Sequence, residues 1–216
     1  MAPTIDRVLV DLGGVLTVDP WETLLLTPGT GIADRMGLDR ALVERVGLAL
    51  WDEHSRSVTS ESLYWRQFSA QVGAEIHTSL VNTVERELLV VTPDAHRIVA
   101  CLRERSAPWG LITNNTAFWY PKQLDLLGMT PADPQWHFTS FAAGVEKGDD
   151  PGLFELAAGT IDAEHTAVID DRPSNVERAQ RCGFQATMYR VGDVIPFTVD
   201  CKPQRSTNET TPETTP

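Results

Sequence analysis

Short apolar runs alternate with amphipathic stretches along most of the chain. The runs have the length of buried strands, and the stretches between them carry apolar residues at the spacing of one helical face. The predicted strands are Arg7–Val10, Trp109–Ile112, His137–Phe141, Thr166–Ile169 and Ala186–Tyr189. Strands that alternate with helices predict an α/β fold with a doubly wound, mostly parallel, Rossmann-like sheet.

The segments between these strands supply the predicted helices of the sheet domain. Asp94 is placed to cap a helix whose apolar residues share one face. Those residues are Ala95, Ile98, Val99 and Leu102. The other predicted helices are Phe118–Leu127, Leu153–Ala158 and Val176–Cys182.

Residues 20–90 interrupt the alternation of strands and helices. Their apolar positions recur at helical spacing in three stretches. These positions are Leu42, Val43, Val46 and Leu50 in the first, Tyr64, Phe68 and Val72 in the second, and Ile76, Leu80, Val84 and Leu88 in the third. We expect an all-helical insertion, with residues 1–19 and 91–201 forming the α/β core. The tail 202–216 is rich in Thr, Pro and Glu, and its composition predicts disorder.

The chain is acidic, since its 216 residues include 18 Lys and Arg against 30 Asp and Glu, for a net charge of −12. This balance disfavours nucleic acid and anionic membranes as partners, so an anionic substrate would need local attraction from a metal ion or a few basic side chains. No apolar run approaches membrane-spanning length, and the first residues lack the pattern of a secretory signal. We expect a cytoplasmic protein without a membrane partner.

Asp11 stands where the first strand ends and a glycine turn begins, in Val8-Leu9-Val10-Asp11-Leu12-Gly13-Gly14. A buried strand would deliver this carboxylate to the carboxyl edge of the sheet, and the glycines allow the backbone to turn sharply and approach a ligand closely. Such a carboxylate is placed to act as a nucleophile. The alternative interpretation is an Asp that caps the following turn.

Three later segments add polar groups in a defined order. The second strand ends in Thr113-Asn114-Asn115, Lys147 lies in a loop before a helix, and the fourth strand ends in Asp170-Asp171, with Asn175 beyond. A hydroxyl, amides, a cation and paired acids are parts of a phosphoryl-transfer site. The ordered set resembles the four signature motifs of the haloacid dehalogenase (HAD) superfamily of hydrolases and phosphatases, over nearly the whole chain up to about Arg190.

The resemblance implies a role for each residue of the first three segments. Asp11 would be the nucleophile that forms an aspartyl-phosphate, which divides a difficult hydrolysis into two displacements. Thr113 and the amides after it, beginning with Asn114, would hydrogen-bond a phosphoryl oxygen. Lys147 would neutralise the nucleophile and the charge on the transferring group.

The adjacent acids Asp170 and Asp171 would repel each other unless something offsets their charges. Magnesium is the expected compensation, because it is a hard cation that prefers carboxylate oxygens and retains several waters. The family pattern favours Asp171 as the direct ligand, with Asp170 close by and Asn175 in support. It also implies ligation by Asp11 and by the main-chain carbonyl of Gly13.

Residues 20–90 resemble the C1-type cap of the HAD family, which closes over the active site and selects the substrate. The candidate substrate contacts within this segment are Trp21, Trp51, His54, Arg56 and Arg66. For each of them, packing or a place on the surface is the favoured interpretation.

Two features depart from the family pattern. Most phosphatases of the family have a second Asp two residues after the nucleophile, serving as general acid and then general base, but this chain has Gly13. Asp19, a cap residue or the substrate would then have to handle the proton. The lysine is usually followed by Pro-Asp-Pro, whereas Lys147-Gly148-Asp149-Asp150-Pro151 is one residue longer.

Three functions are consistent with these motifs. The leading hypothesis is a magnesium-dependent phosphatase that acts on a small phosphorylated metabolite. The second is a metal-free 2-haloacid dehalogenase, which also lacks the second Asp but does not need the Asp170-Asp171 pair. The third is a binding or non-hydrolytic protein on the same scaffold, because a fold does not settle a function.

Overall fold

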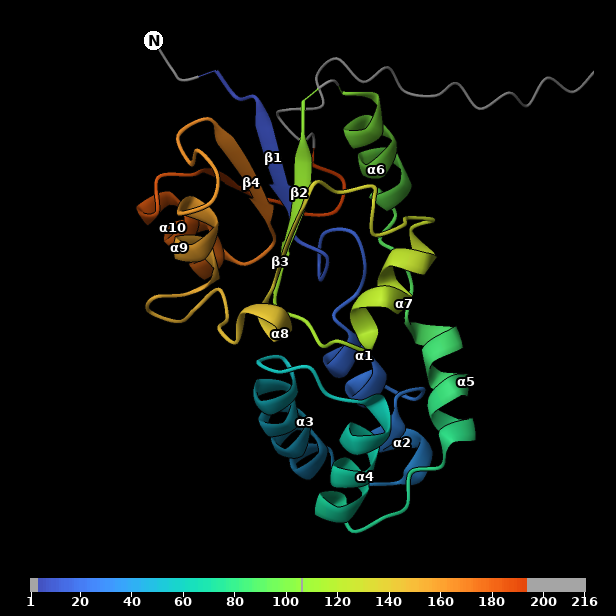
Figure 1. Ribbon diagram of the computed structural model, residues 1–216. Helices are drawn as coiled ribbons and strands as arrows, with labels where there is room; N and C mark the ends of the chain where they lie inside the picture. Colours follow the sequence, from blue (N-terminus) through green and yellow to red (C-terminus); the bar gives the residue numbers. More distant parts are fainter. Residues whose placement is uncertain (1–3, 106, 194–216) are drawn as a thin grey trace, which may run out of the picture.

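A parallel sheet of five strands forms the centre of the computed structural model, which describes residues 4–105 and 107–193 (Figure 1). The strands are β1 (Arg7–Val10), β2 (Trp109–Thr113), β3 (Trp136–Thr139), β4 (Thr166–Asp170) and β5 (Gln185–Met188). Their order is β3-β2-β1-β4-β5, and every neighbouring pair is parallel. β2 and β3 lie on one side of β1, and β4 and β5 lie on the other. The carboxyl ends of β1 and β4 therefore flank the point where the strand order reverses.

Helices cover both faces of the sheet (Figure 1). They are α6 (Ala95–Glu104), α7 (Trp119–Leu126), α9 (Leu153–Ala158) and α10 (Pro173–Arg181), while the short α8 (Ser140–Ala143) lies at the carboxyl end of β3. Val8 and Val10 of β1 pack with α6 and α7, whereas Leu9 packs with α9 and α10. Successive strand side chains point to opposite faces, which is why a strand buried on both sides is apolar throughout. The predicted doubly wound α/β fold is confirmed.

Among the element boundaries that differ from the prediction, two involve apolar residues, Phe141 and Ile76, that lie two positions outside the observed element. The expected strand His137–Phe141 ends at Thr139 instead, because the short helix α8 begins at Ser140 and carries Phe141 back onto the sheet core. Ile76, expected on the third helix of the insertion, lies before that helix but is still buried within the insertion. Both residues pack in the interior, Ile76 fully and Phe141 partly buried, but the predicted secondary structure was wrong.

Asp94 precedes α6 as predicted, but its carboxylate does not cap the helix. It accepts hydrogen bonds from the Tyr189 hydroxyl at 2.8 Å and from the Gly192 amide at 2.7 Å. The prediction of a side-chain cap was therefore wrong, because a tertiary contact uses the acceptor. Asp94 ties the segment after β5 to the start of α6.

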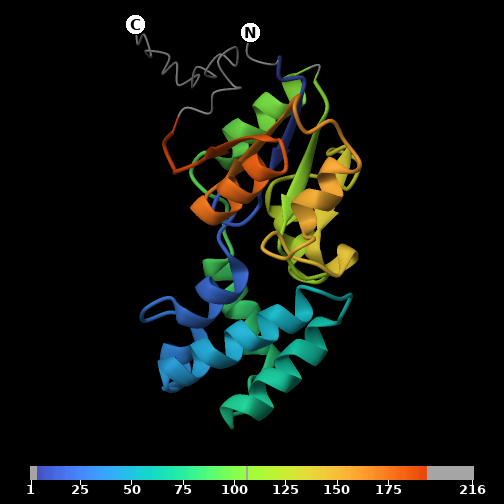
Figure 2. The ribbon, with the colours of Figure 1, turned by 90° about the vertical axis from the view of Figure 1, so that its left-hand side faces the viewer.

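The segment between β1 and α6 folds into five helices below the carboxyl edge of the sheet (Figures 1 and 2). They are α1 (Pro20–Leu26), α2 (Ile32–Met36), α3 (Arg40–His54), α4 (Glu61–Val72) and α5 (Thr78–Leu88). The sequence predicted only the three longer ones, because α1 and α2 are too short to repeat a helical period. We call these five helices the cap.

The cap has its own hydrophobic cluster, which includes Leu50, Tyr64 and Phe68. Phe118 and Trp119, at the start of α7, belong to the same cluster. The sheet domain thus contributes two rings to the interior of the cap. Among the described residues, every helix is too short or too polar to cross a lipid bilayer.

Tyr64 gives a test of the cap interior. Its side chain is fully buried, and its hydroxyl has no hydrogen-bond partner among the described residues. We expect Tyr64→Phe to leave the free energy of unfolding unchanged or to raise it by about 1–3 kcal/mol, the cost of an unsatisfied buried polar group. In the control, Tyr189→Phe removes a charge-assisted bond and should lower stability by about 1 kcal/mol or more. Chemical denaturation measures both, and destabilisation by Tyr64→Phe would contradict the expectation.

Candidate active site

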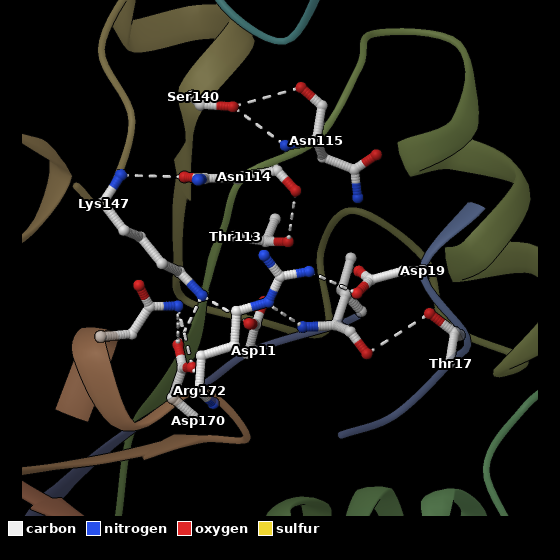
Figure 3. A network of polar contacts seen from close by, with 12 residues as sticks. Asp11, Thr17, Asp19, Thr113, Asn114, Asn115, Ser140, Lys147, Asp170 and Arg172 are labelled. Carbon is white, nitrogen blue, oxygen red and sulfur yellow. Dashed lines mark hydrogen bonds and ion pairs between the residues drawn. The ribbon is translucent and has the colours of Figure 1, made fainter. Parts of the chain in front are cut away.

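A buried lysine links the ends of β1 and β4 (Figure 3). Lys147 Nζ lies 2.6 Å from Asp11 Oδ2 and 2.7 Å from Asp170 Oδ2. The lysine is 1% exposed, Asp11 6% and Asp170 0%. Because β1 and β4 are parallel neighbours, their last residues meet at one edge of the sheet. The structure therefore brings together three of the residues predicted to form the site.

Each charged group in this cluster is held by further hydrogen bonds. Asp11 Oδ1 accepts from the Leu12 amide at 2.7 Å. Asp170 Oδ1 accepts from the Arg172 amide and from Asn175 Nδ2, both at 2.9 Å. Asn175 thus supports Asp170 rather than Asp171. The side chains are fixed before any ligand arrives, which is the pre-organisation that electrostatic catalysis requires.

The buried charges shift one another's pKa values. Burial raises the pKa of Asp11 to about 8, with Lys147 opposing the rise and Asp170 adding to it. Burial alone would lower the pKa of Lys147, but the carboxylates of Asp11 and Asp170 raise it overall. The lysine is therefore protonated, while the raised pKa of Asp11 favours the uncharged form of that side chain at neutral pH. An additional cation would favour the ionised form of Asp11.

Asp171 adds a third carboxylate to this cluster. Its Oδ1 is buried without a hydrogen-bond partner among the described residues. Carboxylate oxygens of Asp11, Asp170 and Asp171 lie within 4.8 Å of one another. Gly14 makes room for Asp171, since a Cβ at position 14 would lie 2.1 Å from Asp171 Oδ2 and the backbone φ there is +71°. An unsatisfied carboxylate oxygen in an acidic cluster fits a hard divalent cation.

Asp19 occupies the space beside Gly13. A Cβ at position 13 would lie 2.0 Å from Asp19 Oδ1, so this carboxylate lies where a side chain at position 13 would begin. The other oxygen, Oδ2, accepts from Arg172 Nη2 at 2.7 Å (Figure 3). No local pattern marks Arg172 as a site residue, because its partner is 153 positions away along the chain.

Thr113 and Asn114 both lie at the end of β2, next to the charged cluster (Figure 3). The buried Thr113 hydroxyl donates to the Asn114 carbonyl at 3.2 Å. Asn114 Oδ1 accepts from the Lys147 amide at 2.9 Å. Asn114 was predicted to contact phosphate, and in this structure its side chain positions the lysine backbone. Contact of either residue with a phosphoryl group stays a prediction.

Two of the cap residues predicted to contact substrate, Trp51 and His54, pack against other side chains. His54 is fully buried, and its ring nitrogens lie 2.6 Å from Thr59 Oγ1 and 2.6 Å from Gln67 Oε1. Trp51 is half-buried and stacks on Trp119, with ring centroids 6.1 Å apart. The structure does not bring His54 to the carboxylate cluster, because hydrogen bonds inside the cap use both of its nitrogens.

Comparison with solved structures identifies the fold. A predicted HAD-like family hydrolase from Porphyromonas gingivalis matches at a TM-score of 0.63 and 24% identity, over 88% of this chain and 93% of that chain. A HAD family enzyme from Bacteroides thetaiotaomicron, in complex with magnesium and inorganic phosphate, matches at 0.68 and 17%, over 88% and 96%. An L-2-haloacid dehalogenase from Xanthobacter autotrophicus, with chloropropionic acid covalently bound, matches at 0.55 and 16%, over 86% and 77%.

The sheet, the helices on both faces and the acidic edge define an α/β protein with a charged site at the ends of its strands. Its fold is that of the HAD family of hydrolases. No family model matches the sequence, and no curated protein matches it.

The lysine cluster predicts a large and specific loss of stability. Lys147→Met leaves two buried carboxylates without their cation and should lower the free energy of unfolding by about 3–5 kcal/mol, when measured with a chelator so that no metal compensates. The loss should shrink as the pH falls, because the carboxylates then take up protons. Lys122→Met is the control: Lys122 lies 2.8 Å from Glu61 and 2.7 Å from Glu85 but is 33% exposed, so we expect about 1 kcal/mol or less. Equal losses from the two substitutions would contradict this account.

Proposed function

We propose that the protein is a magnesium-dependent phosphatase that hydrolyses a small phosphorylated metabolite through an aspartyl-phosphate. The observation that carries the proposal is one cluster that contains both a lysine-paired Asp11 and an Asp171 oxygen without a partner among the described residues. The first supplies a nucleophile and the second supplies a ligand for a cation. The Bacteroides enzyme of the same fold, in complex with magnesium and inorganic phosphate, supports this combination.

The covalent steps use residues whose positions the geometry defines. A carboxylate oxygen of Asp11 attacks phosphorus, the phosphorus–oxygen bond of the ester breaks, and the departing oxygen takes a proton. Water then attacks the phosphorus of the aspartyl-phosphate and releases phosphate, which regenerates the carboxylate. Lys147 balances negative charge on Asp11 and on the phosphoryl group in both steps.

Magnesium would be held by Asp11 and Asp171, and by the main-chain carbonyl of Gly13 as the family resemblance implies. When bound, the ion would neutralise part of the phosphoryl charge. Asp170 is already engaged with Lys147, Asn175 and the Arg172 amide, so we assign it to holding the lysine. This division of roles follows from the hydrogen bonds that each carboxylate makes.

We further propose that Asp19 replaces the general acid that is missing at Gly13. Its Oδ1 lies where a side chain at position 13 would begin, and Arg172 holds the other oxygen in place. Asp19 precedes α1, but its side chain makes no capping hydrogen bond to that helix, so local structure does not account for the orientation of the carboxylate. A carboxyl group there would protonate the leaving oxygen and then accept a proton from the attacking water.

The alternative is a 2-haloacid dehalogenase, in which Asp11 attacks carbon and displaces halide. The absence of a carboxylate on Gly13 and the likeness to the Xanthobacter enzyme favour it. The Asp171 oxygen without a hydrogen-bond partner among the described residues is evidence against the dehalogenase, because displacement of halide needs no cation. A protein that binds a phosphorylated compound without hydrolysing it is the remaining alternative.

The proposed reaction predicts phosphate release that requires both the metal and the nucleophile. A panel of phosphorylated metabolites should include one hydrolysed with magnesium and not with a chelator. Asp11→Asn should abolish release, since an amide cannot act as the attacking anion, and magnesium should not restore release in Asp171→Asn. Asp162→Asn, which changes an exposed acid in the loop before β4, at the opposite end of that strand from Asp170, should retain wild-type rates. Halide release from a 2-haloacid in chelator would instead establish the dehalogenase, and binding of phosphate without turnover would establish the non-hydrolytic role.

If Asp19 is the general acid, a carboxylate at position 13 should restore activity that is lost when Asp19 is removed. Asp19→Ala should slow hydrolysis of an alkyl phosphate by about 10²–10⁴-fold, because its leaving group needs a proton, with little effect on an activated aryl phosphate. Gly13→Asp should restore activity only when combined with Asp19→Ala, since the Cβ alone would approach Asp19 Oδ1 to 2.0 Å. The φ angle of Gly13 is not positive, so the backbone can accept a side chain. Equal losses on both leaving groups, or no rescue in a stable double variant, would argue against the assignment.

A further inference from the structure

The cap contacts the loop that carries Lys147 through two adjacent residues, Ser55 and Arg56, just after α3. Ser55 Oγ donates to Glu146 Oε1 at 2.6 Å. Arg56 Nη2 lies 3.4 Å from Glu146 Oε2, and its Nη1 pairs with Asp149 Oδ2. The contacted carboxylates stand on either side of Lys147 in the sequence, so the cap reaches both sides of the lysine.

Hydrogen bonds of the loop backbone connect these contacts to Lys147. Asp149 Oδ2, which Arg56 contacts, accepts from the Glu146 amide at 2.7 Å. The next amide, that of Lys147, donates to Asn114 Oδ1 at 2.9 Å. Two successive amides, those of Glu146 and Lys147, are thus both hydrogen-bonded. Asn114 binds the Lys147 amide at the end of β2, and Asp149, which pairs with Arg56 of the cap, binds the Glu146 amide.

The strength of these contacts fits a positioning role better than a stabilising one. The side chains of Arg56 and Asp149 are each 30% exposed, and ion pairs with this exposure contribute little to stability. The hydrogen bond to Arg56 lowers the pKa of Asp149, which keeps that carboxylate charged. Lys147, by contrast, must stay within hydrogen-bond distance of two buried carboxylates, so a small shift of its backbone would break that geometry.

We propose that Arg56 and Ser55 are positioning residues that couple the docking of the cap to the placement of Lys147 against Asp11 and Asp170. The kinetic part of this inference rests on the proposed phosphatase function, and the structural part does not. It replaces the expectation that Arg56 contacts substrate. It also gives a role to the loop that is one residue longer than usual, since that loop carries the carboxylate of Asp149 to the cap.

The structural part is tested by backbone amide hydrogen exchange in the full chain without substrate. Arg56→Gln should speed exchange at the Glu146 and Lys147 amides by about tenfold, the effect expected from losing one charge-assisted hydrogen bond. Arg40→Gln is the matched control, because Arg40 pairs with Asp34 inside the cap at 2.8 Å and does not touch the loop. Exchange that stays unchanged in Arg56→Gln, or that rises equally in Arg40→Gln, would overturn the proposal. Should Arg56→Gln fail to fold, Ser55→Ala replaces it in the same comparison.

The kinetic part separates positioning from substrate contact. Arg56→Gln should lower kcat by about tenfold or more on both the metabolite and a small activated aryl phosphate, with KM little changed, because a displaced lysine impairs every substrate. Arg56→Lys should restore part of the rate. A higher KM for the metabolite alone would make Arg56 a substrate contact and overturn the proposal. Faster exchange in Arg56→Gln of a protein without phosphatase activity would support the coupling and reject the proposed function.

Discussion

The ammonium group of Lys147, buried between Asp11 and Asp170, is the interaction on which the arrangement of the site depends. The lysine comes from the loop after α8, while the two acids lie at the ends of the neighbouring strands β1 and β4, so one side chain joins this loop to the edge of the sheet. One cation serves two buried carboxyl groups, and Asp171 adds a third carboxyl group nearby. The shortage of positive charge that makes full ionisation of the cluster costly also gives it affinity for a divalent cation.

Much of the fold follows from the sequence because the strands are buried on both faces. Val8, Leu9 and Val10 must all be apolar when helices cover the sheet on each side, and this produces a run that is easy to recognise. The errors arose where burial does not determine secondary structure. Phe141 was assigned to the end of a strand but belongs to the first turn of a helix, and α1 and α2 are shorter than the windows in which a helical period repeats.

In the site, too, residues that depend on local sequence could be predicted, and pairs formed by tertiary contacts could not. Asp11, Asp170 and Asp171 could be placed from the sequence, because the end of a parallel strand has a known position in the fold. Pairs such as Arg172 with Asp19 could not, since no local pattern connects two charges that are 153 residues apart. The sequence does not show whether the ring nitrogens of a histidine face solvent, a ligand or neighbouring side chains. In His54 both nitrogens face neighbouring side chains, Thr59 and Gln67.

The two rings that α7 contributes to the cap make the inserted segment incomplete by itself. Phe118 and Trp119 belong to the aromatic cluster of the cap, and Trp119 Nε1 also donates to Glu85 of α5 at 2.9 Å. A chimera that exchanged only the inserted helices would leave these rings facing a foreign surface and would open a cavity in the transplanted part. The smallest unit that can be exchanged between proteins of this fold therefore includes the first turn of α7.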